Sequence, residues 1–136
     1  MSQDRAPGKA VELPPLPGSD DTIAALATAP GHTALAVIRL SGPNAFVVAK
    51  QVIDPWPATP RQTTLGQIID PRSGALLDRA IVVRYDAPRS YTGEDMVEIT
   101  SHGGHLVPAT ILAALIGAGA RLASAGENSL LFQPSR

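Results

Sequence analysis

Two charged residues of opposite sign interrupt otherwise apolar stretches of the sequence. Glu98 lies within the run "MVEIT", and Arg39 is the only charge in the run "TALAVIRL". Burying an unpaired charge costs several kcal/mol, so each side chain needs a partner or water. If both runs are strands, the two charges either approach each other or face a shared polar ligand. The alternative is that both end on a solvated sheet face, which is common in antiparallel folds.

Strand periodicity decides which neighbours share a face with each charge. Because side chains alternate along a strand, Glu98 shares its face with Met96, Thr100 and His102. Arg39 shares its face with alternate residues of its own run, which are otherwise uncharged. The polar face of the later strand is therefore the one that carries Glu98.

Other candidates for chemistry are weaker. His102 and His105 flank a Gly-Gly pair, but a zinc site needs at least a third ligand and usually a fourth. We therefore expect His102 to be packed or hydrogen-bonded at the end of a strand. Glu94 and Asp95 in "YTGED" are possible acids, although this segment is equally a turn that satisfies its own backbone.

Composition narrows the class of protein. The chain has 136 residues, 44% hydrophobic and 17% charged, which is typical of one globular domain. A net charge of -1 gives no overall attraction to nucleic acid or anionic lipid, and the absence of cysteine excludes disulfides and thiolate chemistry. No apolar run approaches twenty residues, so we expect no membrane span and a cytoplasmic location. There is no P-loop or Gly-x-Ser-x-Gly motif, and no triad is convincing.

Hydrophobic patterns and turn residues predict five strands and two helices. The strands are expected at Thr22–Thr28, Thr33–Leu40, Thr64–Ile69, Ala75–Tyr85 and Met96–Ser101, and the helices at Pro43–Ile53 and Leu106–Ile116. The third and fourth strands form a hairpin, and Gly103 and Gly104 are expected to form a tight turn. This pattern indicates an α+β fold, a mixed sheet with packed helices.

The second predicted helix is apolar on nearly every side. A helix of this kind needs cover on two sides, and a domain of this size supplies only one. We therefore expect its outer side to contact a partner, either a second copy of the chain or a neighbouring domain.

Four segments together resemble a known family. "DTIAALATAPG", "AVIRLSGPNA", "YTGEDMVEITSHGG" and "VPATILAALIGAGARLASAGE" are similar, in order and spacing, to the N-terminal domain of the tRNA modification GTPases MnmE/TrmE. The resemblance covers about Asp21 to Glu127. It divides the chain into a Pro- and Gly-rich flexible leader at 1–20, a folate-binding and dimerisation domain at 21–127, and a divergent tail at 128–136.

The resemblance implies a fold similar to the folate-binding domain of the glycine-cleavage aminomethyltransferases. It also implies a homodimer that binds a tetrahydrofolate derivative, 5-formyltetrahydrofolate, as a source of one-carbon units. Carried over by position, Arg39 and Glu98 are folate-contacting residues, and no catalytic residue or metal ligand is assigned. In the full-length family the partners are tRNA and an MnmG-like flavoprotein, and the GTP site lies outside this segment.

The sequence also departs from the family pattern. The family usually has Gly-Arg-Gly-Gly where this chain has "GHTA" from Gly31 to Ala34, and the downstream segment with a folate-contacting lysine has no counterpart before Arg136. We therefore expect a truncated or isolated module that is inactive as an enzyme alone and binds folate more weakly than a complete member. The alternative is a degenerate module that only dimerises or docks.

Overall fold

The computed structural model describes residues 21–29 and 31–124. The strands are β1 (Ile23–Leu26), β2 (Gly31–Ser41), β3 (Ile53–Asp54), β4 (Thr64–Ile69), β5 (Leu76–Tyr85), β6 (Met96–Gly104) and β7 (Arg121–Leu122), and the helices are α1 (Ala45–Lys50) and α2 (Leu106–Gly117). The predicted leader and tail lie outside the described residues.

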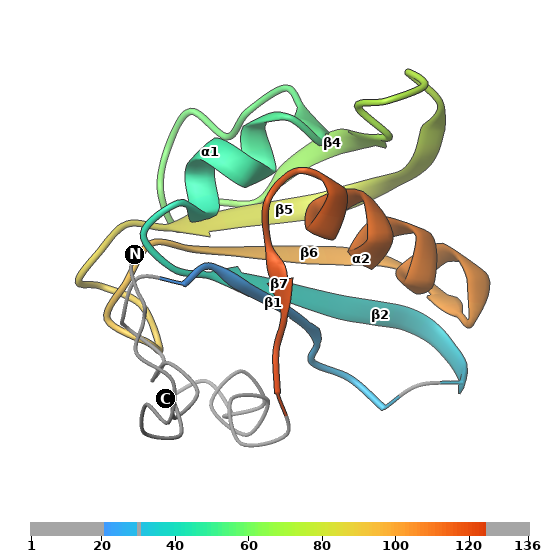
Figure 1. Cartoon of the computed structure of the whole chain (residues 1–136), viewed down its shortest axis with the longest axis horizontal. Coiled ribbons are helices and arrows are strands. Elements are labelled where there is room, and N and C mark those ends of the chain that lie inside the picture. The colour runs from blue at the N-terminus through green and yellow to red at the C-terminus, as the bar shows by residue number, and fades with distance from the viewer. Residues whose placement is uncertain (1–20, 30, 125–136) are drawn as a thin grey trace, which may run out of the picture.

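The strands form one mixed sheet (Figure 1), in the order β3-β4-β5-β6-β2-β1-β7. All neighbouring strands are antiparallel except β1 and β7, which run parallel. The long strands β2 and β6 are paired near the middle of the sheet. The α+β class and the β4–β5 hairpin predicted from the sequence are confirmed.

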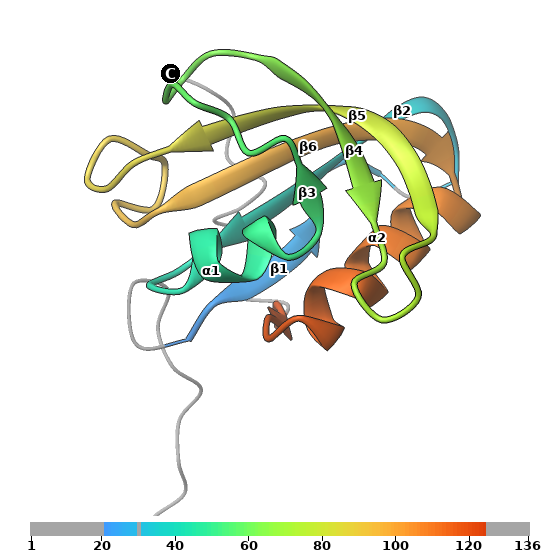
Figure 2. The same cartoon turned by 90° about the horizontal axis from the view of Figure 1, so that it is seen from above.

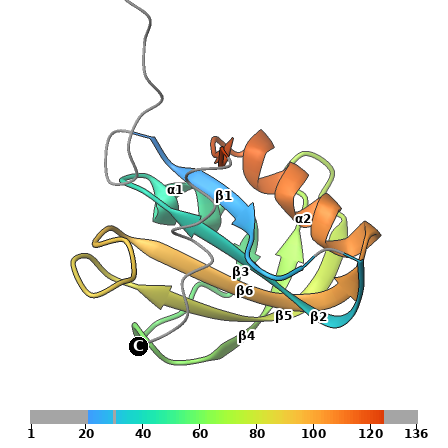
Figure 3. The same ribbon diagram turned by 90° about the horizontal axis from the view of Figure 1, so that it is seen from below.

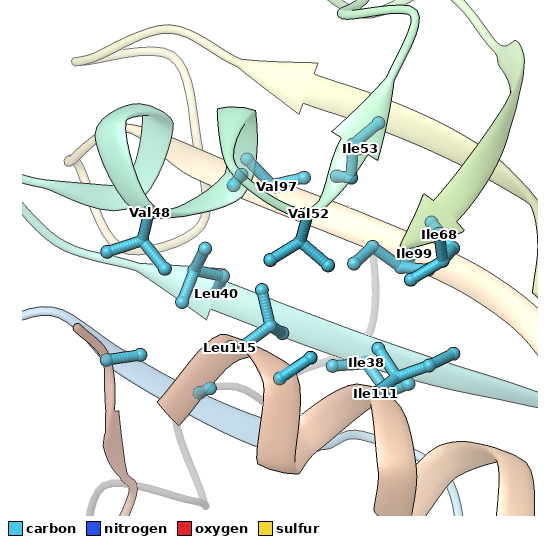
Figure 4. Packing of buried hydrophobic residues seen from close by; sticks show 14 of the residues in the cluster. Ile38, Leu40, Val48, Val52, Ile53, Ile68, Val97, Ile99, Ile111 and Leu115 are labelled. Atoms are coloured by element: carbon cyan, nitrogen blue, oxygen red, sulfur yellow. The ribbon is translucent and has the colours of Figure 1, made fainter. Parts of the chain in front are cut away.

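Both helices cover the same face of the sheet, as Figure 2 shows from above. On this face Ile38 and Leu40 of β2 and Val97 and Ile99 of β6 are fully buried. Figure 4 shows these side chains packed against Val48 and Val52 from the α1 region and against Ile111 and Leu115 of α2. Because strand side chains alternate, the core residues fix which face receives the residues between them.

The first helix is shorter than predicted. It ends at Lys50, and Ile53–Asp54 pairs with β4 as the short strand β3, with Ile53 opposite Ile68. Two β-branched residues, Val52 and Ile53, disfavour helix, and Asp54 precedes a proline that disfavours the helical conformation for the residue before it. Helical periodicity alone therefore overestimated the length of this element.

The expected tight turn at Gly103 and Gly104 is wrong, because both glycines belong to β6. The β2–β6 ladder continues to the pair Gly31 and Gly104 after an irregularity in register. At Gly103 the backbone of Thr33 approaches so closely that an added Cβ would lie 2.0 Å from its carbonyl oxygen. Gly103 therefore permits two strands to approach, and does not reverse the chain.

Helix α2 agrees with the prediction of a helix apolar on nearly all sides. Its buried residues are Pro108, Ile111, Ala114 and Leu115, whereas Leu106 is 74% exposed. The whole helix carries no charged side chain. Among the described residues, no helix is long and apolar enough to cross a bilayer.

Substituting Gly103→Ala should destabilise the fold by about 1 to 3 kcal/mol, because the added methyl group overlaps backbone atoms of Thr33. Chemical denaturation followed by circular dichroism measures this free energy of unfolding. The matched control is Gly117→Ala, whose Cβ would meet only the end of the Arg72 side chain at 4.0 Å. The control should be neutral or stabilising by up to about 1 kcal/mol, and equal destabilisation by both variants would contradict the close approach at Gly103.

Candidate functional site

Arg39 and Glu98 face each other on the neighbouring strands β2 and β6. They are register partners in the β2–β6 ladder, and Arg39 Nε lies 2.8 Å from Glu98 Oε2. Their side chains are 12% and 19% exposed, so the pair is largely withdrawn from water. The prediction that these two charges approach each other is confirmed. The prediction that they contact folate stays a prediction.

This ion pair lies on the face of the sheet opposite the helices. The side chains on either side of Glu98 in sequence, Val97 and Ile99, belong to the helix-covered core, so Glu98 points away from it. Figure 3 shows both helices on one side of the sheet and the β5–β6 loop at its end. Of the helices and strands that the structure describes, none lies over Arg39 and Glu98 on this open face.

Two tyrosines complete a cluster around the ion pair. The ring of Tyr91 lies under the Arg39 guanidinium, with Arg39 Cζ 4.7 Å from the ring centroid. Tyr85 lies near it, with 6.3 Å between the two ring centroids. Tyr85 reaches this face because Val83, two residues earlier in β5, is the register partner of Glu98. We call Arg39, Glu98, Tyr85 and Tyr91 the open-face cluster.

The loop after β5 is held in place by the residues of "YTGED". The Thr92 hydroxyl lies 2.6 Å from the Ser41 hydroxyl at the end of β2. Gly93 adopts a left-handed φ of 81° that favours glycine. The Asp95 carboxylate accepts the Ala87 backbone N–H at 2.9 Å. Within the segment, the Glu94 backbone N–H donates to the Thr92 hydroxyl oxygen at 3.4 Å, which supports its interpretation as a self-satisfying turn. The turn also carries Tyr91 to Arg39.

The electrostatic environment of the open-face cluster acts on Tyr85. Burial, the nearby Glu98 carboxylate and Tyr91 raise the pKa of the Tyr85 phenol above its usual value of 10.0, although Arg39 and Arg61 oppose the increase. The raised pKa favours the protonated phenol in the folded state. The stability that it contributes is present below about pH 10 and is lost as the pH rises through the folded-state pKa.

His102 lies at a separate place on the sheet. Its Nδ1 is 2.8 Å from Asp78 Oδ1, and its backbone N–H donates to Asp78 Oδ2 at 2.9 Å. Burial raises the pKa of Asp78, but hydrogen bonds from His102 and from the Arg79 backbone outweigh it, and the pKa falls below its usual value. The expectation that His102 is hydrogen-bonded near the strand end is confirmed. Within residues 21–29 and 31–124, no three potential metal-ligating side chains gather.

The open-face cluster offers a carboxylate acceptor beside two aromatic rings. Within the described part of the chain, the Glu98 carboxylate accepts a hydrogen bond from Arg39 through Oε2, which leaves its second oxygen as an acceptor. Sequence reasoning did not select Tyr85 or Tyr91. Alternation along β5 could have placed Tyr85 on this face, but only once the pairing of Val83 with Glu98 was known.

The fold and this cluster define a small α+β domain with a polar and aromatic cluster on an open sheet face. The chain matches the family described as GTP-binding protein TrmE N-terminus over residues 22–130. The chain therefore belongs to this family, and the resemblance noted from the sequence is confirmed.

Bacterial proteins named tRNA modification GTPase MnmE are among its relatives. The one from Moorella thermoacetica is 47% identical over 114 residues, 79% of this chain and 25% of the relative. The one from Thermus thermophilus is 43% identical over 110 residues, and the one from Caulobacter vibrioides is 48% identical over 107 residues; each match covers 79% of this chain, and 26% and 23% of the relatives, respectively. The chain thus spans about a quarter of the length of the curated relatives that it matches.

The substitution Glu98→Gln should lower the pKa of Tyr85, because it removes a negative charge that disfavours the phenolate and leaves Arg39 uncompensated. The chain has two tyrosines, so alkaline ultraviolet difference titration in a Tyr91→Phe background reports Tyr85 alone. Asp78→Asn in the same background is a matched control that should leave the Tyr85 pKa in place. A Tyr85 pKa that does not change with Glu98→Gln would contradict the geometry of the cluster.

Proposed function

We propose that the chain is a folate-binding module of the tRNA modification machinery, and that it acts as a dimer. The observation that carries the folate assignment is the Arg39–Glu98 pair, which lies with two tyrosines on the open face of the sheet. The expected ligand is a tetrahydrofolate derivative such as 5-formyltetrahydrofolate. No residue is assigned a bond-breaking role in this chain.

The chemistry of a pterin supports this assignment. A pterin presents an exocyclic amine beside a ring N–H, and these two parallel donors match the two oxygens of a carboxylate. Glu98 supplies the carboxylate, and the 2.8 Å contact with Arg39 orients it. The flat rings of Tyr85 and Tyr91 supply apolar surface for a planar ligand.

The relatives indicate where such a module would act. They are named tRNA modification GTPases, and this chain covers about a quarter of their length. The chain contains no P-loop motif. Our proposal therefore assigns folate binding to this segment and GTP hydrolysis to other parts of such proteins. It places the module in the cytoplasm with tRNA and an MnmG-like flavoprotein as partners, and it includes a fold related to that of the glycine-cleavage aminomethyltransferases.

The substitution Glu98→Gln should weaken binding of 5-formyltetrahydrofolate by about 2 to 4 kcal/mol, because the amide replaces one acceptor with a donor and removes the charge. Isothermal titration calorimetry of the purified chain measures this difference. Circular dichroism should show an intact fold in the variant.

The matched control for this experiment is Asp54→Asn, which makes the same change of charge on the exposed edge strand β3. Folate affinity should be the same in the control and the original chain. Equal affinity in the Glu98→Gln variant would remove Glu98 from the site. If the original chain releases no heat with folate, the alternative function, a module that only dimerises or docks, would be favoured.

The outer side of α2 supports the dimer in this proposal. Leu106, Ala109, Ala113 and Ile116 are exposed and recur at helical spacing, so they form an apolar stripe opposite the buried side of the helix. Small residues at the centre of the stripe would allow a second helix to approach closely. A second copy of the chain offers the same stripe, as a two-fold interface requires.

The substitution Ala113→Glu should dissociate the dimer, because it would bury a charge in the middle of the apolar stripe. Sedimentation velocity measures the oligomeric state, and we expect the dissociation constant to rise at least about tenfold. The control is Val47→Glu, on α1, where Val47 is also exposed and apolar. If Ala113→Glu and the original chain dimerise equally, the interface lies elsewhere.

A further inference from the structure

A cavity of about 560 Å³ lies between two loops at the end of β5. One wall is formed by residues 59–62, which lead from β3 to β4, and the other by residues 86–89, which follow β5. Neither the Arg39–Glu98 pair nor any other residue of the open-face cluster lines this cavity.

The loops around the cavity are attached to the end of β5. The Arg61 backbone N–H donates to the Arg84 carbonyl oxygen at 2.8 Å, and Arg84 Nη2 donates to the Ala58 carbonyl oxygen at 3.4 Å. On the other wall, the Arg89 N–H donates to the Asp86 carbonyl oxygen at 2.9 Å. The two walls therefore share one support, the end of β5.

The charge of the cavity lining is positive. Arg61 and Arg89 line it, and among the ion pairs of the described residues neither takes part in one. The only acid in the lining, Asp86, faces Arg84 at 3.5 Å, too far for a hydrogen bond. Two guanidinium groups at one opening are suited to carboxylate or phosphate oxygens.

The backbone conformation at Arg61 is a further indication of a ligand. Arg61 has a left-handed φ of 63°, which is strained for a residue other than glycine, and such strain concentrates at binding sites. Asp86 Oδ1 and Arg84 Nε, which are buried without a hydrogen bond, face each other as an ion pair at 3.5 Å, whereas the Asp86 side chain as a whole is 45% exposed. The site thus combines two cationic donors with a partly exposed carboxylate acceptor. A chain of glutamyl residues carries both carboxylates and amide N–H groups, whereas a phosphodiester carries no donor.

Tyr85 connects this cavity to the open-face cluster. Glu98 and Arg39 of the open-face cluster act electrostatically on its phenol, and so does Arg61 of the cavity. Val83, the register partner of Glu98, is separated from Arg89 by six residues, at most about 20 Å of extended chain. A folate bound at Glu98 by its pterin could therefore extend its other end along Tyr85.

We infer that Arg61 and Arg89 bind the carboxylates of the glutamyl tail of the folate whose pterin contacts Glu98. This inference rests on the proposed function and adds to it a preference for folates with several glutamates. Asp86 accepts an amide N–H of the tail, and the two arginines bind the carboxylates. No covalent step is involved.

The test is calorimetric titration of the whole chain with three ligands. These are 5-formyltetrahydrofolate with three glutamates, the same compound with one glutamate, and 5-formyltetrahydropteroate, which has none. The original chain should bind the triglutamate at least about tenfold more tightly than the tail-free compound. In Arg61→Gln/Arg89→Gln this preference should disappear, and affinity for the tail-free compound should stay within about twofold.

A matched control and a milder variant keep the test decisive. Arg72→Gln removes an arginine that is 74% exposed in the β4–β5 turn, and it should retain the preference. The single variant Arg89→Gln leaves the strained residue Arg61 untouched, and it should lose part of the preference even if the double variant unfolds. Trp56 fluorescence reports whether each variant is folded.

The possible failures are distinguishable. Equal affinity of the original chain for all three ligands would overturn the glutamyl site and leave the pterin site at Glu98 standing. If both arginine variants still preferred the triglutamate, the glutamyl site would likewise be overturned, and the pterin site at Glu98 would stand. If none of the three ligands binds, the proposed folate function and the inference both fail.

Discussion

The register between β2 and β6 is the constraint on which the rest of the site depends. It places Arg39 opposite Glu98 on the open face, while the residues next to them in sequence complete the core beneath the helices. A shift of one residue between the two strands would send one of the two charges into that core, where it could not be hydrated. The buried residues therefore select the register, and the register creates the ion pair. A pair of this kind is weak support for stability, since apolar replacements are often as stable, which favours a role in recognition.

The sequence was sufficient to predict much of the sheet, because the signals for its strands are local. Alternating and continuous apolar runs located five of the strands, and two unmatched charges indicated Arg39 and Glu98 as a unit. Errors occurred where a distant segment determines the structure. Ile53 pairs with Ile68 in a strand although its own segment has helical periodicity, and Gly103 is required by the backbone of Thr33, seventy residues earlier. Neither contact has a signature within its own stretch of sequence.

The rest of the site could not be predicted for the same physical reason. Tyr91 reaches Arg39 because Thr92 and Asp95 fasten the β5–β6 loop to the ends of β2 and β5. Its position is a property of loop closure and not of periodicity. The cavity with Arg61 and Arg89 brings together the loop before β4 and the loop after β5, at the open end of the β4–β5 hairpin. In the sequence these arginines look like two ordinary surface charges among eleven basic residues.

The two faces of the sheet have different physical requirements, and this difference would let one small domain serve both parts of our proposal, ligand binding and assembly. The core between the sheet and the helices is apolar. The outer surface of α2 is also apolar, and Leu106 and Ile116 are exposed there. Apolar surface favours association without demanding a particular charge. The open face instead presents oriented charges and rings, which favour a small polar ligand. Because the same strands β2 and β6 support both faces, an interface on α2 would leave the open-face cluster accessible.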